Sequence, residues 1–365
     1  MSESVQSCCS SCCCEQQEQK TAEKQSHTEP LRHEVVQVDS LLSSHDYFGF
    51  AAMRLGFGRE RYRIKPGLYS IGKPNTESPV LVTANYKMTF DVLRSHLNGV
   101  DAWILVLDTR GINVWCAAGK GTFGTDELVR QVEGCAVASL VSHRELILPQ
   151  LGGPGVAAHE VKKRTGFQVH YGPVRAKDIK SYFDAGRKVT PEMRQIKFPF
   201  WERVILSPLE VVLMFKWICI LAVVVCLLPG LRGLSFSPER IVQIGIPSVG
   251  VLAASWLAAA FLIPALLPWL PGRMLSVKGL CVGIVLGGMI GLLWGVFRVP
   301  FDNGVNMSGL ALIVMALSGY FGLNLTGAMP YTSLSGVKKE MRSSFPMIVF
   351  LFIAGVVLHV AGTFV

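Results

Sequence analysis

The second half of this sequence is almost without charge. Residues 208–365 hold 9 Lys and Arg and 4 Asp and Glu, whereas residues 1–207 hold 26 and 22. Half of the 365 residues are hydrophobic, and the excess lies in the second half. Because so few charges cannot cover the surface of a soluble globule, the sequence excludes a wholly soluble protein and predicts a membrane part.

A basic stripe with interleaved aromatic residues, typical of nucleic-acid-binding surfaces, is also missing. The net charge of +9 divides into +4 for residues 1–207 and +5 for residues 208–365. We therefore expect no nucleic-acid partner.

Cysteine is scarce where a soluble iron–sulfur domain would need it. Residues 45–195 contain Cys116 and Cys135, while half of the ten cysteines form an N-terminal cluster of Cys8, Cys9, Cys12, Cys13 and Cys14. That cluster lacks the spacing of a [4Fe–4S] site, and its use stays open between soft-metal capture and an incidental or palmitoylation-like role. The first thirty residues lack the apolar run of a secretory signal, so we expect the N-terminal half in the reducing cytoplasm, without disulfides.

Composition divides the chain into four segments. Residues 1–44 are rich in Ser, Gln, Glu and Lys and predict a disordered tail. Residues 45–195 alternate short apolar runs with helical patterns, which predicts an α/β domain with a mostly parallel, Rossmann-like sheet. A linker at 196–207 then leads into an all-α transmembrane domain at 208–365.

Five apolar runs in the last segment are each about long enough to cross a ~30 Å hydrocarbon layer. We expect these helices at about 211–228, 241–263, 279–297, 307–325 and 346–365. Lys and Arg are modestly enriched in the loops that would share a side with the N-terminus. The sequence therefore predicts a multi-pass protein of the inner membrane, with the α/β domain in the cytoplasm and the C-terminus outside.

Ligands of parallel sheets bind at the carboxyl ends of the strands. The expected strands include residues 79–84, 102–107, 145–149 and 167–171. Thr83 and Asn85 lie at the end of the first strand, where each is either a ligand contact or a turn residue. The glycine turn at 152–155, which contains Gly153, is a weak ligand signal, because Gly-Pro runs mostly mark turns.

The segment Asn113-Val-Trp-Cys-Ala-Ala-Gly-Lys120 follows the second of these strands. Ala-Ala-Gly-Lys suits a short helix, which puts Cys116 at the head of the turn. Aligned backbone N–H groups and Lys120 would favour the thiolate over the thiol. Cys116 is therefore a candidate metal ligand or nucleophile, and the competing interpretation is a small buried hydrophobic residue.

This segment resembles the cap-helix motif of the mercury-methylating corrinoid proteins, the membrane members of the two-protein mercury methylation system. Further matching segments are Lys65-Pro-Gly-Leu-Tyr69, Ser78-Pro-Val-Leu-Val-Thr-Ala-Asn-Tyr-Lys-Met-Thr-Phe-Asp91 and Tyr331-Thr-Ser-Leu-Ser-Gly-Val-Lys-Lys-Glu-Met341. The first two also resemble the large subunit of the corrinoid iron–sulfur protein of acetyl-CoA synthesis. The resemblance covers about 45–195 and the five-span tail.

The resemblance implies a base-off corrinoid (cobalamin) at the sheet edge, with Cys116 as the lower axial cobalt ligand and the catalytic residue. Asn113, Val114 and Trp115 would shape the loop. Small residues after Cys116 would let the macrocycle approach. The implied cofactor contacts are Thr83, Asn85, Asn113, Val114, Trp115, Cys116, Ala117, Ala118, Gly119, Lys120 and Gly153.

The activity that the resemblance implies is a methyltransferase that moves a methyl group from cobalt to Hg(II) and forms methylmercury. The implied partners are a ferredoxin-like electron donor with two [4Fe–4S] clusters, a methyl-donor methyltransferase of the methyltetrahydrofolate pathway, and the lipid bilayer. Two alternatives remain. One is a membrane-anchored corrinoid methyl carrier of one-carbon, acetyl-CoA-type metabolism. The other is a membrane transporter, which is disfavoured because charged residues are nearly absent from the predicted spans.

Overall fold

The computed structural model describes residues 35–59, 61–232, 235–297, 303–329, 332, 334–362 and 364. The chain folds into two compact units. Among the described residues, one unit, the α/β unit, comprises residues 35–43 and 61–194, and the other, the helix bundle, comprises residues 44–59 and those from 195 onward. The short segment 44–59 thus clusters with the C-terminal helices, although the sequence pattern assigns most of it to the α/β domain.

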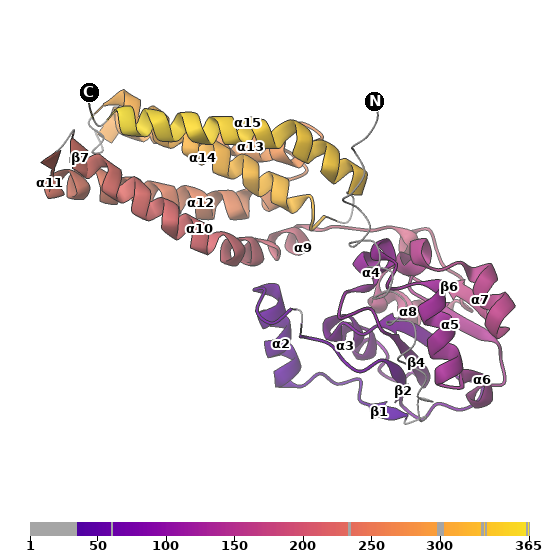
Figure 1. The fold of residues 1–365 in the computed structure, drawn as a ribbon. Coiled ribbons are helices and arrows are strands. Elements are labelled where there is room, and N and C mark those ends of the chain that lie inside the picture. Colours follow the sequence, from indigo (N-terminus) through magenta and orange to yellow (C-terminus); the bar gives the residue numbers. More distant parts are fainter. Residues whose placement is uncertain are drawn as a thin grey trace, which may run out of the picture. The chain divides into compact units, whose positions relative to one another are not determined.

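The α/β unit is built on a six-stranded sheet in the order β1-β2-β4-β3-β5-β6 (Figure 1). Strands β4, β3, β5 and β6 are parallel, and β2 joins β4 antiparallel. The strands are β1 Val36–Val38, β2 Gly67–Ile71, β3 Val80–Ala84, β4 Ala102–Leu107, β5 Glu145–Leu148 and β6 Gln168–Tyr171. The mostly parallel α/β sheet that the sequence predicted is confirmed.

Helices cover both faces of this sheet. The α-helices of the unit are α3 Lys87–Ser95, α4 Val114–Lys120, α5 Thr125–Gly134, α6 Val137–Leu140, α7 Ala158–Thr165 and α8 Ile179–Asp184. Short 3₁₀ segments are η1 Gln150–Gly155, η2 Ala176–Asp178 and η3 Glu192–Arg194. Val80 and Val82 of β3 face a core formed with α4, α5 and α7, while Leu81 faces a second core formed with α3 and α8. Successive side chains of β3 therefore point alternately into two buried cores.

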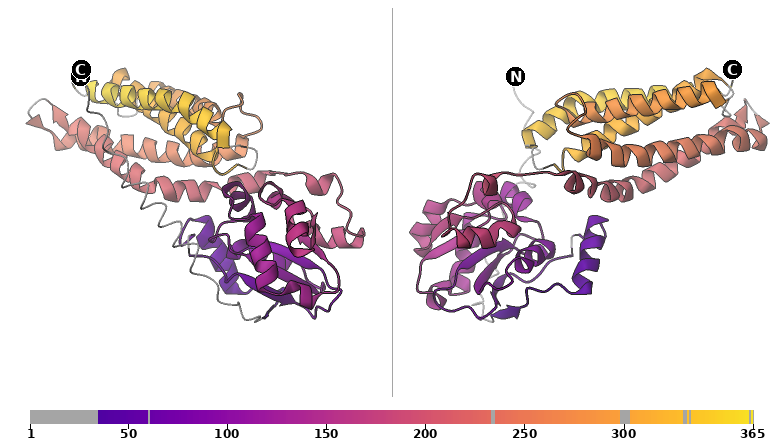
Figure 2. Two further views of the ribbon diagram at one scale, coloured as in Figure 1. Left: turned by 45° about the vertical axis from the view of Figure 1, so that its right-hand side comes forward. Right: turned by 180° about the vertical axis from the view of Figure 1, so that it is seen from behind.

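In its described residues the bundle contains five helices that are long and apolar enough to span a membrane (Figures 1 and 2). Its α-helices are α2 Ser44–Arg54, α9 Phe200–Val204, α10 Ser207–Leu227, α11 Pro238–Arg240, α12 Ile246–Leu266, α13 Leu275–Phe297, α14 Gly304–Leu325 and α15 Leu334–Ala361. The remaining elements are η4 Leu228–Gly230, η5 Ile241–Gly245, β7 Leu231–Arg232 and β8 Ser235–Phe236. The predicted set of about five apolar helices is confirmed.

Glycine sets the distance between α13 and α14. A methyl group added to Gly283 would lie 2.7 Å from the Met315 Cα, and one added to Gly279 would collide with the Ser318 carbonyl oxygen. Because both neighbours are backbone atoms, neither helix can yield to a larger side chain. Small residues therefore allow the two helices to pack backbone against backbone, as is common in membranes.

Candidate functional site

The topological switch point of the sheet lies between β3 and β5. From β3 the chain passes through α3 to β4 on one side, and it then returns through α4 and α5 to β5 on the other. In parallel sheets the carboxyl ends of two such strands leave a crevice that is the usual place for a ligand. A cavity of about 340 Å³ lies at this point.

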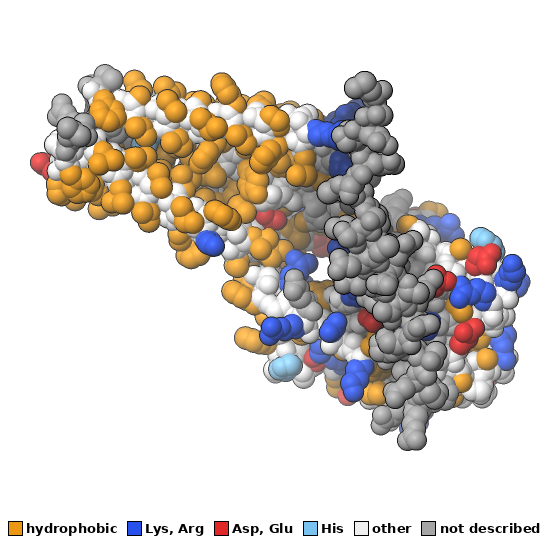
Figure 3. All heavy atoms as spheres, viewed as in Figure 1, with side chains coloured by type: hydrophobic (Ala, Val, Ile, Leu, Met, Phe, Trp, Pro, Cys, Tyr) orange, Lys and Arg blue, Asp and Glu red, His pale blue; other side chains and the backbone are white. Residues whose placement is uncertain are grey.

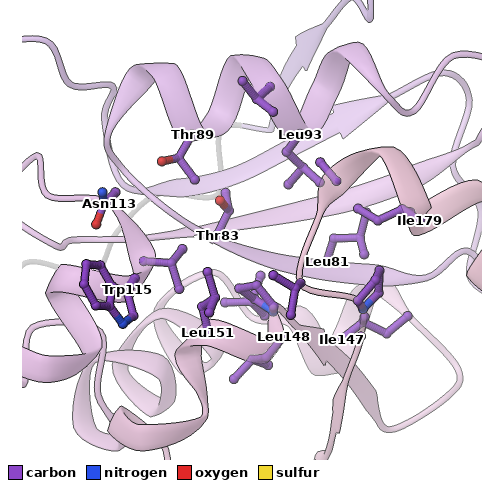
Figure 4. A pocket seen from close by; sticks show the side chains of 18 of the residues that line it. Leu81, Thr83, Thr89, Leu93, Asn113, Trp115, Ile147, Leu148, Leu151 and Ile179 are labelled. Carbon is purple, nitrogen blue, oxygen red and sulfur yellow. The ribbon is translucent and has the colours of Figure 1, made fainter. Parts of the chain in front are cut away.

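The cavity occupies the α3 and α8 side of the sheet and reaches the start of α4 (Figure 4). Its wall is mostly apolar, and the aliphatic side chains include Leu81, Leu93, Ile147 and Ile179. Thr83, Thr89 and Asn113 contribute polar groups near the start of α4 in Figure 4. A few polar groups in an apolar wall are typical of a site for a small molecule or a cofactor.

Asn113 begins helix α4. Its side-chain oxygen accepts a hydrogen bond from the Cys116 backbone N–H at 2.9 Å, so Asn113 is the N-cap. Val114 and Trp115, the first two helical residues, both line the cavity. The sequence analysis assigned Asn113 to the loop, and the structure adds that it stabilises the helix that carries Cys116.

Cys116 lies on the outer side of α4 and is half-buried. Val114, Ala117 and Ala118 face the core, whereas Gly119 and Lys120 are exposed. A methyl group added to Gly119 would meet no atom of the described chain within 4 Å. Cys116 is thus carried by a short, small-residue helix next to the cavity, although Trp115, not Cys116, contributes to the cavity wall.

Asn85 stabilises the loop that precedes α4. Its side-chain oxygen accepts the backbone N–H groups of Thr109 and Gly111 at 3.1 and 2.9 Å, and its amide nitrogen donates to Asp108 at 3.0 Å. The residue is 2% exposed and is not part of the cavity wall. Because Arg110 and Gly111 adopt left-handed backbone angles, with φ of 59° and 76°, this loop needs such a support. Of the two roles expected for Asn85, the structure favours the turn residue.

Thr83 points into the cavity in Figure 4, with 2% of its surface exposed. It precedes Asn85 by two residues, so their side chains project to the same face of the strand end. The sequence analysis treated both as candidate ligand contacts, and only Thr83 lines the cavity.

The glycine turn packs against the segment that follows α4. A methyl group on Gly152 would lie 2.6 Å from the Phe123 ring, and one on Gly155 would clash with the Phe123 carbonyl oxygen. Gly153 is half-buried, with the Tyr171 ring 3.7 Å from such a methyl group, and it lies outside the cavity wall. Close backbone packing therefore accounts for Gly152 and Gly155.

Thr125 does not cap helix α5 through its own side chain. Gly124 occupies the N-cap, and the Thr125 hydroxyl instead accepts the backbone N–H of Ala157 at 2.9 Å. The hydroxyl thus ties the start of α5 to the residue before α7, a long-range contact that local spacing does not reveal.

Several wall residues were missed by the sequence analysis. They come from α3, from the end of β5, from the segment between β6 and α8 and from α8 itself, and include Met88, Thr89, Pro149, Pro173, Val174 and Tyr182. Burial raises the pKa of the Tyr182 phenol, which keeps it neutral. The Gly172-Pro173 pair directly after a strand was the one available signal, because strand carboxyl ends converge on such a site.

Within the residues that the structure describes, no group of three or more His, Cys, Asp or Glu side chains is placed to hold a metal ion. The N-terminal cysteine cluster lies outside the described residues.

Residues 58–183 match the family model described as the CO dehydrogenase/acetyl-CoA synthase delta subunit. The chain is also similar to the acetyl-CoA decarbonylase/synthase complex subunit gamma of Methanopyrus kandleri, with 31% identity over 128 residues, and to that of Archaeoglobus fulgidus, with 30% over 128 residues. Subunit gamma 2 from Methanosarcina thermophila is 32% identical over 124 residues.

These similarities concern one part of each protein. They cover 34%, 34% and 32% of this chain and 27%, 27% and 25% of the respective relatives, so the chain spans about a quarter of the length of these relatives. The matched residues 58–183 contain β2 to β6, helix α4 and the whole cavity wall. The similarity thus concerns the α/β unit and its candidate site.

Proposed function

We propose that this chain is a membrane-anchored corrinoid protein that carries a methyl group in one-carbon metabolism. The observation that carries the proposal is the coincidence of two findings. The segment similar to subunits of acetyl-CoA decarbonylase/synthase complexes is the same segment that forms the switch-point cavity. The cavity lies where a parallel sheet binds a large ligand.

The residues present fit a corrinoid. The cavity offers an apolar wall for a macrocycle, with Thr83, Thr89 and Asn113 as polar contacts at one side. The outer face of α4 carries Cys116 and Gly119, and the space around Gly119 is open for close approach of a flat ligand. When bound, the corrinoid supplies a cobalt ion that accepts and releases the methyl group.

The chain's own residues have separate tasks in this proposal. Cys116 would ligate cobalt through its sulfur, and a thiolate is a strong, soft donor. Asn113 fixes the start of α4 and thereby the position of Cys116, while Asn85 holds the preceding loop. The apolar wall would exclude water from the bound corrinoid.

A second candidate function is methyl transfer to Hg(II), which would form methylmercury. Cys116 favours this candidate, because a thiolate donor raises the electron density available to a methyl group that leaves toward a soft Lewis acid. An ordinary methyl carrier needs no such donor. Both candidates share the corrinoid and differ in the acceptor.

The test uses the purified full chain, reconstituted with methylcobalamin and presented with either Hg(II) or an ordinary thiol acceptor. Cys116→Ala and Cys116→His are compared with Cys135→Ala, which alters the other cysteine of the α/β unit. Transfer to Hg(II) that is lost in both Cys116 variants, and retained in Cys135→Ala, supports the second candidate. Transfer to the thiol that survives in Cys116→His supports the methyl carrier. A protein that binds no corrinoid in any form would refute both.

We also propose the partners and the membrane orientation that the resemblance implies. A low-potential ferredoxin-like protein would supply electrons, and a methyltransferase of the methyltetrahydrofolate pathway would supply the methyl group. The α/β unit would lie in the cytoplasm and the C-terminus outside the inner membrane. Reporter fusions at the two ends test this orientation, and a cytoplasmic C-terminus would contradict it.

A further inference from the structure

Two short helices of the bundle expose aromatic side chains. In and after α2, Tyr47, Phe48 and Phe57 are 61%, 74% and 60% exposed, and in α9 Trp201 is 76% exposed. Such exposure of large aromatic rings is unusual for a water-facing surface and indicates a partner.

Helix α2 has two distinct faces. Asp46, Gly49 and Met53 are buried on one side. Tyr47 and Phe48 project from the opposite side, where the helical repeat also puts Ala51. Figure 3 shows hydrophobic side chains along the outer surface of α2 with basic side chains beside them. The exposed apolar stripe is therefore a continuous feature of the helix.

Both helices lie at the beginning of the first span. A methyl group on Gly56, two residues after α2, would lie 2.9 Å from Leu209 Cδ1 in the first turn of α10. Helix α9 ends at Val204, and α10 begins at Ser207. Figures 1 and 2 show α2 running across the direction of α10. If α10 crosses a bilayer, its first turn marks the headgroup layer, and α2 lies along that layer.

The charges around the stripe have one dominant sign. Arg54, Arg59 and Lys197 are exposed. The single acidic residue of α2, Asp46, is buried, and Glu202 of α9 is half-buried. Lipid phosphates are the anions available at this depth, and aromatic rings favour the same layer.

We propose that α2 and α9 form an interfacial surface that inserts Tyr47, Phe48 and Trp201 into the headgroup layer and binds anionic lipid through Arg54 and Arg59. The partner is the bilayer surface, and a second protein is the competing outcome of the test. Its α2 part gives the chain a membrane contact beyond its five spans, on the segment 44–59 that joins the two parts of the α/β unit, while α9 belongs to the start of the first span.

The experiment uses the full chain in vesicles made of equal amounts of phosphatidylcholine and phosphatidylglycerol. Photoreactive benzoylphenylalanine replaces Phe48, a substitution that keeps the aromatic ring. Matched variants carry it at Phe350, an exposed residue of α15 that serves as the membrane reference, and at His159, an exposed residue of α7. Adducts are identified by mass spectrometry after illumination.

We expect lipid adducts at Phe48 with a yield close to that at Phe350 and well above that at His159. At Phe48 the adducts should be enriched in phosphatidylglycerol, and the double variant Arg54→Gln, Arg59→Gln should abolish the enrichment. Three outcomes would overturn the proposal: adducts to protein alone, equal yields at Phe48 and His159, or no adduct at Phe48. Enrichment that persists in the double variant would refute the role of the two arginines.

Discussion

In the α/β unit the buried Asp91 is held by charged side chains, whereas in the helix bundle the buried Arg203 is held by backbone carbonyl groups. Asp91 of α3 is 1% exposed and pairs with Lys87 and Arg94. Arg203 of α9 is 8% exposed and donates to the carbonyl oxygens of Pro264 and Ala265.

The last turn of α12 explains the difference. Its carbonyl groups lack partners within the helix, and Arg203 donates to those of Pro264 and Ala265. Lys278 donates to the carbonyl groups of Leu267 and Leu270, just after the helix, at 2.7 Å. Cations at a helix C-terminus also interact favourably with the helix dipole. Where little water is available, the carbonyl oxygens at the end of the helix take the place of a negatively charged side chain. Side-chain networks of the kind that can shape a binding site are thus found in the α/β unit.

Removing Asp91 tests the α/β side of this comparison and should have the largest effect on stability. Asp91→Ala leaves Arg94 buried, and loss of one partner of a buried ion pair costs about 3–5 kcal/mol. Arg94 would retain its bonds to the carbonyls of Asp39 and Leu41, so the loss should fall at the lower end of that range. Urea unfolding of the α/β unit measures it.

The matched control is Asp126→Ala, which removes a carboxylate from the exposed pair with Arg164. An exposed pair is worth about 0–1 kcal/mol. Equal losses in the two variants would show that burial does not govern these pairs.

The next largest loss of stability is expected for Asn85→Ala. Asn85→Ala leaves the buried Thr109 N–H and the Gly111 N–H without their acceptor, and each such group costs about 1–3 kcal/mol. We expect a less stable domain with faster amide exchange at residues 108–112. Unchanged exchange there would contradict the role of Asn85 in holding the loop.

Gly155→Ala should also destabilise the α/β unit, because the added methyl group clashes with the Phe123 carbonyl oxygen. Overpacking of this kind costs about 1–3 kcal/mol. Gly119→Ala is the control, since space is open there, and it should change the melting temperature little. A destabilised Gly119→Ala and a neutral Gly155→Ala would reverse our assignment of the two glycines.

The smallest effect is expected when the five long apolar helices are removed. Residues 35–194, expressed alone, contain both cores of the sheet and should fold and bind cobalamin. Circular dichroism and the absorption spectrum of the bound corrinoid measure this. An unfolded or colourless fragment would mean that the α/β unit depends on the bundle.

Local sequence patterns predicted the regular elements well where one physical signal dominates. The run Ala102–Leu107 was predicted as a strand and is β4, because a strand that is buried on both faces of a sheet appears in the sequence as a continuous apolar run. The start of the last span was less accurate. Helix α15 begins at Leu334, before the apolar run from residue 346, since backbone hydrogen bonding continues through polar residues that hydropathy does not count.

The sequence by itself determined that the chain has an α/β part and a part made of apolar helices. It also determined the strands and the short helix around Cys116, because all of these features depend on neighbours within a few residues. The tertiary structure alone decided which segments meet at the site. Thr83, Trp115, Ile147 and Tyr182 are far apart in the chain and line one cavity. Strand order brings them together, and the role of Asn85 depends on a loop more than twenty residues away, which only the paired strands bring within hydrogen-bond distance.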